Sequence, residues 1–210
     1  LALFVFISGY FYKTDYEENI GKYIWKRTKR LLIPAYLWNI FYGGMVAFLG
    51  LFGFTIGAKP DLYNLFVMPF VDGEAFQYNL GSWFVYPLFL VCIINVLFRK
   101  FLKLIHLDNE FIVLIVYLAI GMIGINTAIG NPTAINGIVK LLVRTMFFLP
   151  CYEFGRFYKA VLEKKDTLNN VAYFAIIFAV QLILLTFCKD LEYTPSSFAK
   201  FNNGFVTPYI

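Results

Sequence analysis

Charged residues are scarce in this sequence, and so are the residues that build metal sites. Only 15% of the 210 residues are charged, there is one histidine, and the three cysteines share no close spacing. An ordinary soluble domain has about a quarter of its residues charged, and a disulfide framework or zinc site needs clustered ligands. The sequence therefore predicts no metal site. Cys92, Cys151 and Cys188 are interpreted as small apolar side chains in helix packing.

Long apolar runs take the place of charge. Hydrophobic residues make up 60% of the chain and the mean hydropathy is +0.68. The runs are roughly 18 to 22 residues long, about the length that a helix needs to cross the hydrocarbon core. They lack the alternation of membrane β-strands, and a helix satisfies its own backbone polar groups within lipid. The fold class predicted is all-α, a polytopic membrane helical bundle with about six or seven hydrophobic segments.

The expected spans form a single transmembrane domain over residues 1–210. Their approximate bounds are 1–12, 31–53, 82–98, 110–128, 138–155 and 171–188, with a further start near 204. Both ends of the sequence lie within apolar runs, so we expect a fragment that is truncated at both ends.

The cations are distributed unequally between the two sides of these spans. Thirteen lie in the loops that follow the first, third and fifth spans, and four on the opposite side. Cytoplasmic loops carry an excess of Lys and Arg, so the basic side is predicted to face the cytoplasm. Because the basic character sets orientation, it requires no nucleic-acid partner. The thirteen are Lys13, Lys22, Lys26, Arg27, Lys29, Arg30, Arg99, Lys100, Lys103, Arg156, Lys159, Lys164 and Lys165; the four are Lys59, Lys140, Lys189 and Lys200.

Four motifs occur in a definite order along the chain. They are FISGYFYK (6–13), KYIWKRTKRLLIPAYLWNIFY (22–42), LGSWFVYPLFLV (80–91) and FFLPCYEFGRFY (147–158). The pairing of F-x-S-G-Y with R-x-x-R-L-L-I-P-x-Y resembles the acyltransferase-3 family, polytopic enzymes that O-acylate cell-envelope sugars in bacteria. The resemblance is good over about residues 1–100 and weaker beyond.

This resemblance implies a membrane O-acyltransferase that transfers an acyl group, here an acetyl group, from acyl-CoA to a hydroxyl of a cell-envelope carbohydrate. It implies a multi-pass protein of the bacterial cytoplasmic (inner) membrane with no tightly bound cofactor. The expected partners are membrane lipid, acyl-CoA, and an envelope polysaccharide or lipid-linked sugar. The family's catalytic histidine would lie before Leu1, so the catalytic residue is unknown here and the fragment alone is expected to be inactive.

Arg27 and Arg30 are the first candidates for binding acyl-CoA. At i and i+3 they share a helix face, and paired guanidinium hydrogen bonds suit phosphate groups. The alternative is that both are topology-setting cations in contact with anionic lipid; the resemblance favours the cofactor role. Ser8, Gly9 and Tyr10 are further cofactor-binding candidates that would leave space for the thioester arm. Small residues at these positions also fit close helix packing.

Arg144 and Trp83 are the candidates for binding the acceptor. A cation about six residues into the fifth span either faces a cavity, where a sugar or its phosphate is the ligand, or snorkels to the surface. Trp83 is interpreted as an interfacial anchor first and a sugar-stacking residue second. Glu153 and Arg156 can pair at i and i+3. Three amides are interpreted as interhelical hydrogen-bonding groups: Asn39, Asn95 and Gln181.

The only histidine, His106, lies in a short loop on the basic side. A histidine suits a general base, but a lone loop histidine is interpreted here as solvated. A transporter or flippase for an envelope precursor is the rival function, with Arg144 and the amides lining its pathway. Transporters often show repeated, Pro-broken helices. Pro34 and Pro87 interrupt apolar runs, yet no repeat is visible.

Overall fold

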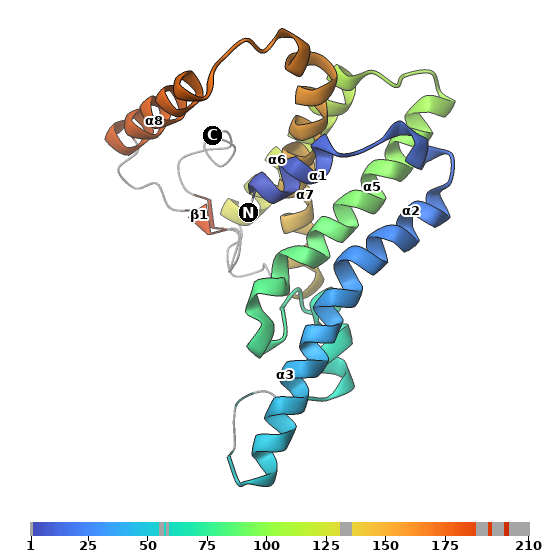
Figure 1. Ribbon diagram of the computed structural model, residues 1–210, viewed down its shortest axis with the longest axis vertical. Helices are drawn as coiled ribbons and strands as arrows, with labels where there is room; N and C mark the ends of the chain where they lie inside the picture. Colours follow the sequence, from blue (N-terminus) through green and yellow to red (C-terminus); the bar gives the residue numbers. More distant parts are fainter. Residues whose placement is uncertain are drawn as a thin grey trace.

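The protein is a bundle of helices in a computed structural model that describes residues 2–54, 57, 59–130, 136–187, 193–194 and 200–201 (Figure 1). Its α-helices are α1 (Ala2–Tyr10), α2 (Ile20–Arg27), α3 (Ile33–Leu51), α4 (Met68–Val71), α5 (Val85–Leu104), α6 (Glu110–Gly130), α7 (Gly137–Phe157) and α8 (Asn170–Phe187). Two short strands, β1 (Tyr193–Thr194) and β2 (Lys200–Phe201), pair antiparallel. The predicted all-α membrane bundle is confirmed. The span start near 204 and Cys188 lie outside the described residues.

The second predicted span is longer than its apolar run. α2, a π-helical turn over Thr28–Leu32 and α3 form one continuous helix, Ile20–Leu51, along the long axis of the molecule (Figure 1). Asn19 caps its start, where the Asn19 side chain accepts a hydrogen bond from the Lys22 amide at 3.2 Å. Pro34, which has no N–H to donate, is the second residue of α3 after the π turn. The helix therefore extends eleven residues N-terminal of the expected start at residue 31.

Among the described residues, three helical stretches are long and apolar enough to cross a membrane. They are Ile20–Leu51, Gln77–Leu104 and Glu110–Ile129, and Asn170–Thr186 is a shorter apolar helix. Large apolar side chains on their outer faces are exposed, among them Phe41 and Phe48 of α3 and Phe174 of α8. Exposed apolar surface of this extent is expected of helices that face lipid.

α7 lies at the centre of the bundle and packs against α6, α1 and α5. Glycines allow α1 and α7 to touch backbone to backbone. A Cβ at Gly9 would lie 1.8 Å from the carbonyl oxygen of Tyr152, and a Cβ at Gly155 would lie 1.9 Å from that of Phe6. The packing interpretation of Gly9 therefore fits the structure, because no larger residue leaves room for this crossing.

The segment between α3 and α5 folds back onto the bundle and contains the π-helical turn Tyr63–Val67, α4 and the 3-10 segment Gln77–Phe84. Asn39 of α3 holds it in place. The Asn39 amide donates to the carbonyl oxygen of Leu65 at 2.8 Å, and its oxygen accepts from the Asn79 amide at 2.7 Å. Asn39 thus confirms its predicted role as a buried hydrogen-bonding group between segments.

The other two amides differ from each other. Asn95 is buried and its oxygen accepts a hydrogen bond from the Tyr117 hydroxyl at 3.2 Å, which joins α5 to α6 as predicted. Gln181 is exposed on α8 and forms no side-chain hydrogen bond with another described residue, so its predicted interhelical role is wrong within the described chain.

Candidate functional site

A cluster of buried charges lies where α5 and α7 end and α6 begins. Arg99 of α5 is fully buried, and its Nη2 lies 2.6 Å from Glu153 Oε1 and 2.7 Å from Glu110 Oε2. Its Nη1 lies 3.4 Å from Asp108 Oδ1. A buried arginine is stable only when carboxylates and hydrogen bonds replace its lost hydration, and here three carboxylates surround it. We call this end of the bundle the basic end.

Arg156 of α7 extends the cluster to the segment that precedes α2. Its Nη2 lies 2.8 Å from Glu110 Oε1, and its Nη1 lies 3.7 Å from Glu17 Oε1. The Arg156 guanidinium also lies over the Tyr12 ring, 4.9 Å from its centroid, and the Tyr12 hydroxyl donates to Glu17 at 3.3 Å. Glu17 is buried on the 3-10 turn Thr14–Glu17, so the cluster fixes that turn against the bundle.

Two predictions about these residues are wrong. Arg99 and Arg156 were expected among loop cations, but both belong to helices and are buried. Glu153 and Arg156 do not form the predicted i, i+3 pair, because Glu153 binds Arg99 and Arg156 binds Glu110. The physical reason is that oppositely charged side chains on neighbouring helices offer shorter contacts than a partner one turn along the same helix.

Arg27 and Arg30 have different environments. The Arg27 guanidinium lies over the Tyr23 ring, 5.2 Å from its centroid, and is partly buried. It also interacts electrostatically with the buried Cys92 and Tyr152. Arg30 is exposed. Arg27 directly precedes the π turn Thr28–Leu32 and Arg30 lies within it, and the i→i+5 hydrogen bonds of this turn place more residues in each turn than an α-helix does. The structure therefore directs Arg27 inward and leaves Arg30 at the surface.

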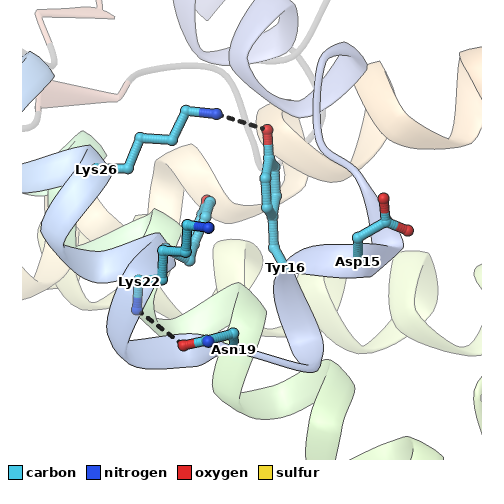
Figure 2. A pocket seen from close by; sticks show the side chains of 6 residues that line it. Asp15, Tyr16, Asn19, Lys22 and Lys26 are labelled. Atoms are coloured by element: carbon cyan, nitrogen blue, oxygen red, sulfur yellow. Dashed lines mark hydrogen bonds between the residues drawn. The ribbon is translucent and has the colours of Figure 1, made fainter.

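A pocket of about 260 Å³ opens at the basic end beside Tyr23. Tyr23 forms part of the wall of this pocket together with Lys22 and Lys26 of α2, and the Arg27 guanidinium lies over the Tyr23 ring. Figure 2 shows Lys26 reaching the Tyr16 hydroxyl, which lies 3.4 Å from its ammonium. Asp15 is the acidic residue of this pocket. Because two lysines outnumber one aspartate, the pocket favours an anionic ligand.

Ser8, Gly9 and Tyr10 are placed on α1 against α7 rather than beside Arg30. Gly9 is at the helix crossing described above, and Ser8 is partly buried. The Tyr10 hydroxyl donates to Glu163, and the Lys159 ammonium lies 5.0 Å from the centroid of the Tyr10 ring. Tyr152 contacts this group and also Tyr12. Its backbone touches Gly9, and its ring centroid lies 6.3 Å from that of Tyr12.

Arg144 and Trp83 are brought together at the opposite end of α7. The Arg144 guanidinium lies 4.9 Å from the centroid of the Trp83 ring and donates to the carbonyl oxygen of Gly73 at 2.5 Å. Arg144 is 2% exposed, so it neither snorkels nor lies open to solvent. Trp83 also stacks on Phe148, with ring centroids 6.1 Å apart. Lys140, predicted at the rim, is buried and pairs with Glu74. We call this group the far end.

The remaining polar candidates offer no general base in the described chain. His106 is exposed in the loop after α5 with a φ of 55°, as expected of a solvated residue. Tyr158, just beyond α7, donates a hydrogen bond to Asp166, which raises the pKa of Tyr158 to about 12 because ionisation would place two negative charges together. Cys92 and Cys151 are free and buried, as predicted for packing residues. Within the described ranges no group of three His, Cys, Asp or Glu residues could hold a metal.

The carboxylates at the basic end were missed as members of the site. Sequence reasoning counted cations on that side for topology and, apart from pairing Glu153 with Arg156, left out the acidic residues there. Glu17, Asp108, Glu110 and Glu153 all belong to the predicted basic side. The presence of these carboxylates on the same predicted side as Arg99 and Arg156 was the feature of the sequence that could have indicated a charge network.

Comparison with known proteins identifies a family for this chain. The family model described as "Acyltransferase domain" matches residues 1–204, nearly the whole chain. No curated protein and no solved structure matches it.

Proposed function

Because this chain belongs to the acyltransferase-3 family and is a membrane acyltransferase, we propose that it transfers an acetyl group from acetyl-CoA to a hydroxyl of a cell-envelope carbohydrate. We further propose that it does so in the cytoplasmic membrane of a bacterium, with the basic end toward the cytosol. There the donor would arrive, since coenzyme A is charged and does not cross lipid unaided.

The observation that carries the donor site is the position of Arg27. Its guanidinium lies on the Tyr23 ring, which forms part of the wall of a lysine-lined pocket. A guanidinium binds the pyrophosphate oxygens of coenzyme A through paired hydrogen bonds. The aromatic face restricts the rotamers of Arg27 and keeps it charged in a partly buried place. Arg30, exposed three residues further on within the π turn, would add longer-range attraction to the phosphates.

The proposed reaction is a direct transfer between two bound substrates. A general base removes the proton from the sugar hydroxyl, whose oxygen attacks the thioester carbonyl. The C–S bond then breaks, the acetyl group stays on the sugar oxygen, and the coenzyme A thiolate takes up a proton. The main contribution of these helices would be to position the donor. His106 is exposed, and it is not proposed as that base.

The acceptor site remains our prediction at the far end, with Arg144 and Trp83. The contacts of Arg144 with Gly73 and Trp83 favour a supporting role. Arg144 would hold the segment around Gly73 and the Trp83 ring in the positions that the sugar needs. A transporter or flippase, the alternative from sequence, receives no support from the family match.

The test uses the natural full-length protein in lipid nanodiscs, with transfer of labelled acetyl from acetyl-CoA to envelope polysaccharide as the readout. Arg27→Ala should raise the KM for acetyl-CoA at least about tenfold, since a charge-assisted hydrogen bond contributes about 1.5–3 kcal/mol. The KM of Arg27→Lys should lie between those of the wild type and Arg27→Ala, because lysine keeps the charge and loses the paired hydrogen-bond geometry. Arg30→Ala should have a smaller effect than Arg27→Ala.

Lys100→Ala is the matched control, because Lys100 is an exposed cation of α5 at the same end of the bundle. It should leave the KM unchanged. Unaltered transfer in Arg27→Ala would remove the donor-site assignment. A wild-type protein that moves no acetyl group to any envelope carbohydrate would overturn the proposed reaction as a whole.

A further inference from the structure

A second, larger cleft lies at the basic end, between the end of α1 and the end of α7. Its volume is about 450 Å³. Four cations line it, Lys13, Arg156, Lys159 and Lys164, together with the carboxylates of Asp15 and Glu110. The cations come from two separate stretches of chain, so only the folded structure gathers them around one space.

The charges of this cleft are not balanced internally. Glu110 is already shared between Arg99 and Arg156. Lys13 and Lys164 form no ion pair with any other residue in the described part of the chain. Lys159 lies over the Tyr10 ring, which leaves its charge unneutralised. The cleft therefore has a positive field that one aspartate does not cancel, and it favours an anion.

Arg156 adds a buried guanidinium behind the lysines, with Glu110 and Glu17 as its ionic partners. Its side chain is 8% exposed, and its Nη1 has no hydrogen-bond partner among the described residues. Charges that are withheld from water act more strongly on a neighbouring ligand than exposed charges do. The wall of the cleft thus combines flexible surface lysines with one fixed guanidinium, a combination suited to a compact and highly charged group such as a phosphate monoester.

The cleft and the pocket beside Tyr23 adjoin each other. Asp15 lines both. Tyr12 lies on the wall of the cleft, and its ring centroid is 6.0 Å from that of Tyr23, over which the Arg27 guanidinium lies. A long ligand can therefore occupy both spaces at once. The pyrophosphate belongs at the Arg27 side, and the thioester arm continues beyond it into the more buried part of the bundle, since acyl transfer requires that water be excluded. The opposite end of the ligand then reaches the open, lysine-lined cleft.

We propose that this cleft binds the 3′-phosphate at the nucleotide end of the acyl-CoA donor, with Lys159, Lys164 and Arg156 as the phosphate-binding residues. The inference rests on the proposed function, because it assumes that the donor is a coenzyme A thioester. It assigns to the cleft a task separate from that of Arg27: recognition of the ribose phosphate, which distinguishes coenzyme A from its 3′-dephospho form.

Equilibrium binding of coenzyme A and of 3′-dephospho-coenzyme A to the natural full-length protein tests the assignment. The protein is held in nanodiscs of zwitterionic lipid. The wild type should bind coenzyme A about tenfold more tightly than the dephospho form. The double variant Lys159→Ala/Lys164→Ala should lose this preference by weakening coenzyme A alone. Arg27→Ala should weaken both ligands. Lys165→Ala, the adjacent exposed lysine that does not line the cleft, should behave as wild type.

Each other outcome decides against the assignment. Equal affinity of the wild type for the two ligands would overturn the cleft's role while leaving the proposed reaction in place. Binding of neither ligand would overturn the donor and the cleft assignment together. Nanodiscs with phosphatidylglycerol separate a lipid headgroup from a free ligand. If the double variant lost only a stabilisation by that lipid and kept the tenfold ligand preference, the cleft would be a headgroup site.

Discussion

The two ends of α7 hold their buried arginines in different ways. At the basic end, Arg99 and Arg156 meet the carboxylates of Glu153 and Glu110 at 2.6–2.8 Å. At the far end, Arg144 lies against the Trp83 ring and donates to a backbone carbonyl. Both arrangements bury a guanidinium almost completely. At the basic end one partner of Arg99, Glu153, is itself charged and buried.

This difference determines what remains when the arginine is removed. Loss of Arg99 leaves Glu153, which is fully buried, without its hydrogen-bonded cation. Loss of Arg144 removes its hydrogen bond to the Gly73 carbonyl and its contact with the Trp83 ring, two groups that carry no net charge. Stranding a buried charge costs more than leaving a neutral group unpaired. The basic end is therefore expected to be much less tolerant of substitution than the far end, although both lie on one helix.

The largest effect is expected for Arg99→Met. The substitution should lower the free energy of unfolding by about 3–5 kcal/mol, the usual result of breaking a buried ion pair from one side. The measurement is a denaturation curve of the natural full-length protein in mixed micelles. A loss below about 1 kcal/mol would contradict the comparison, since it would mean that Glu153 finds adequate partners without Arg99.

The double variant Arg99→Met/Glu153→Gln sharpens this prediction. It removes the stranded charge as well as the arginine, so it should be more stable than Arg99→Met alone. If the two substitutions were instead additive, the Arg99–Glu153 contact would contribute nothing of its own and the difference between the two ends would need another cause.

A smaller effect is expected for Arg144→Met at the far end. One buried hydrogen bond to the Gly73 carbonyl and one cation–π contact are lost, and the free energy of unfolding should fall by about 1–3 kcal/mol. Glu74, the nearby carboxylate, has a half-exposed side chain and remains hydrated. The same denaturation measurement applies. A loss equal to that of Arg99→Met would abolish the distinction between the ends.

The positions of the helices could be predicted from the sequence because apolar length is a local property. The expected spans 110–128, 138–155 and 171–188 lie within two residues of α6, α7 and α8 at each end. The start of the long helix at Ile20 was missed because residues 20–30 are polar and basic, and hydropathy gives no signal for a capped helix outside the lipid. Only the Asn19 cap marked it.

The candidate site was less accessible to sequence reasoning. Arg99 and Glu153 are 54 residues apart in the chain, and no periodicity relates residues on different helices. The i, i+3 rule paired Glu153 with Arg156, which was wrong because it considers one helix only. The meeting of Arg144 with Trp83 depends on how α7 packs against the segment before α5. Such pairings follow from tertiary packing and not from the pattern of any one segment.

Lys103→Met is expected to have the smallest effect and completes the comparison from within α5. Lys103 lies one turn beyond Arg99, and its ammonium is 3.8 Å from Glu17 Oε2, yet its side chain is 58% exposed. An exposed ion pair contributes little, and Glu17 keeps its contacts with Arg156 and Tyr12. The free energy of unfolding should change by no more than about 0.5 kcal/mol. A fall of more than about 1 kcal/mol in the free energy of unfolding, measured in the same micelles, would show that exposed ion pairs of the network also stabilise the fold. Burial alone would then not explain the sensitivity of the basic end.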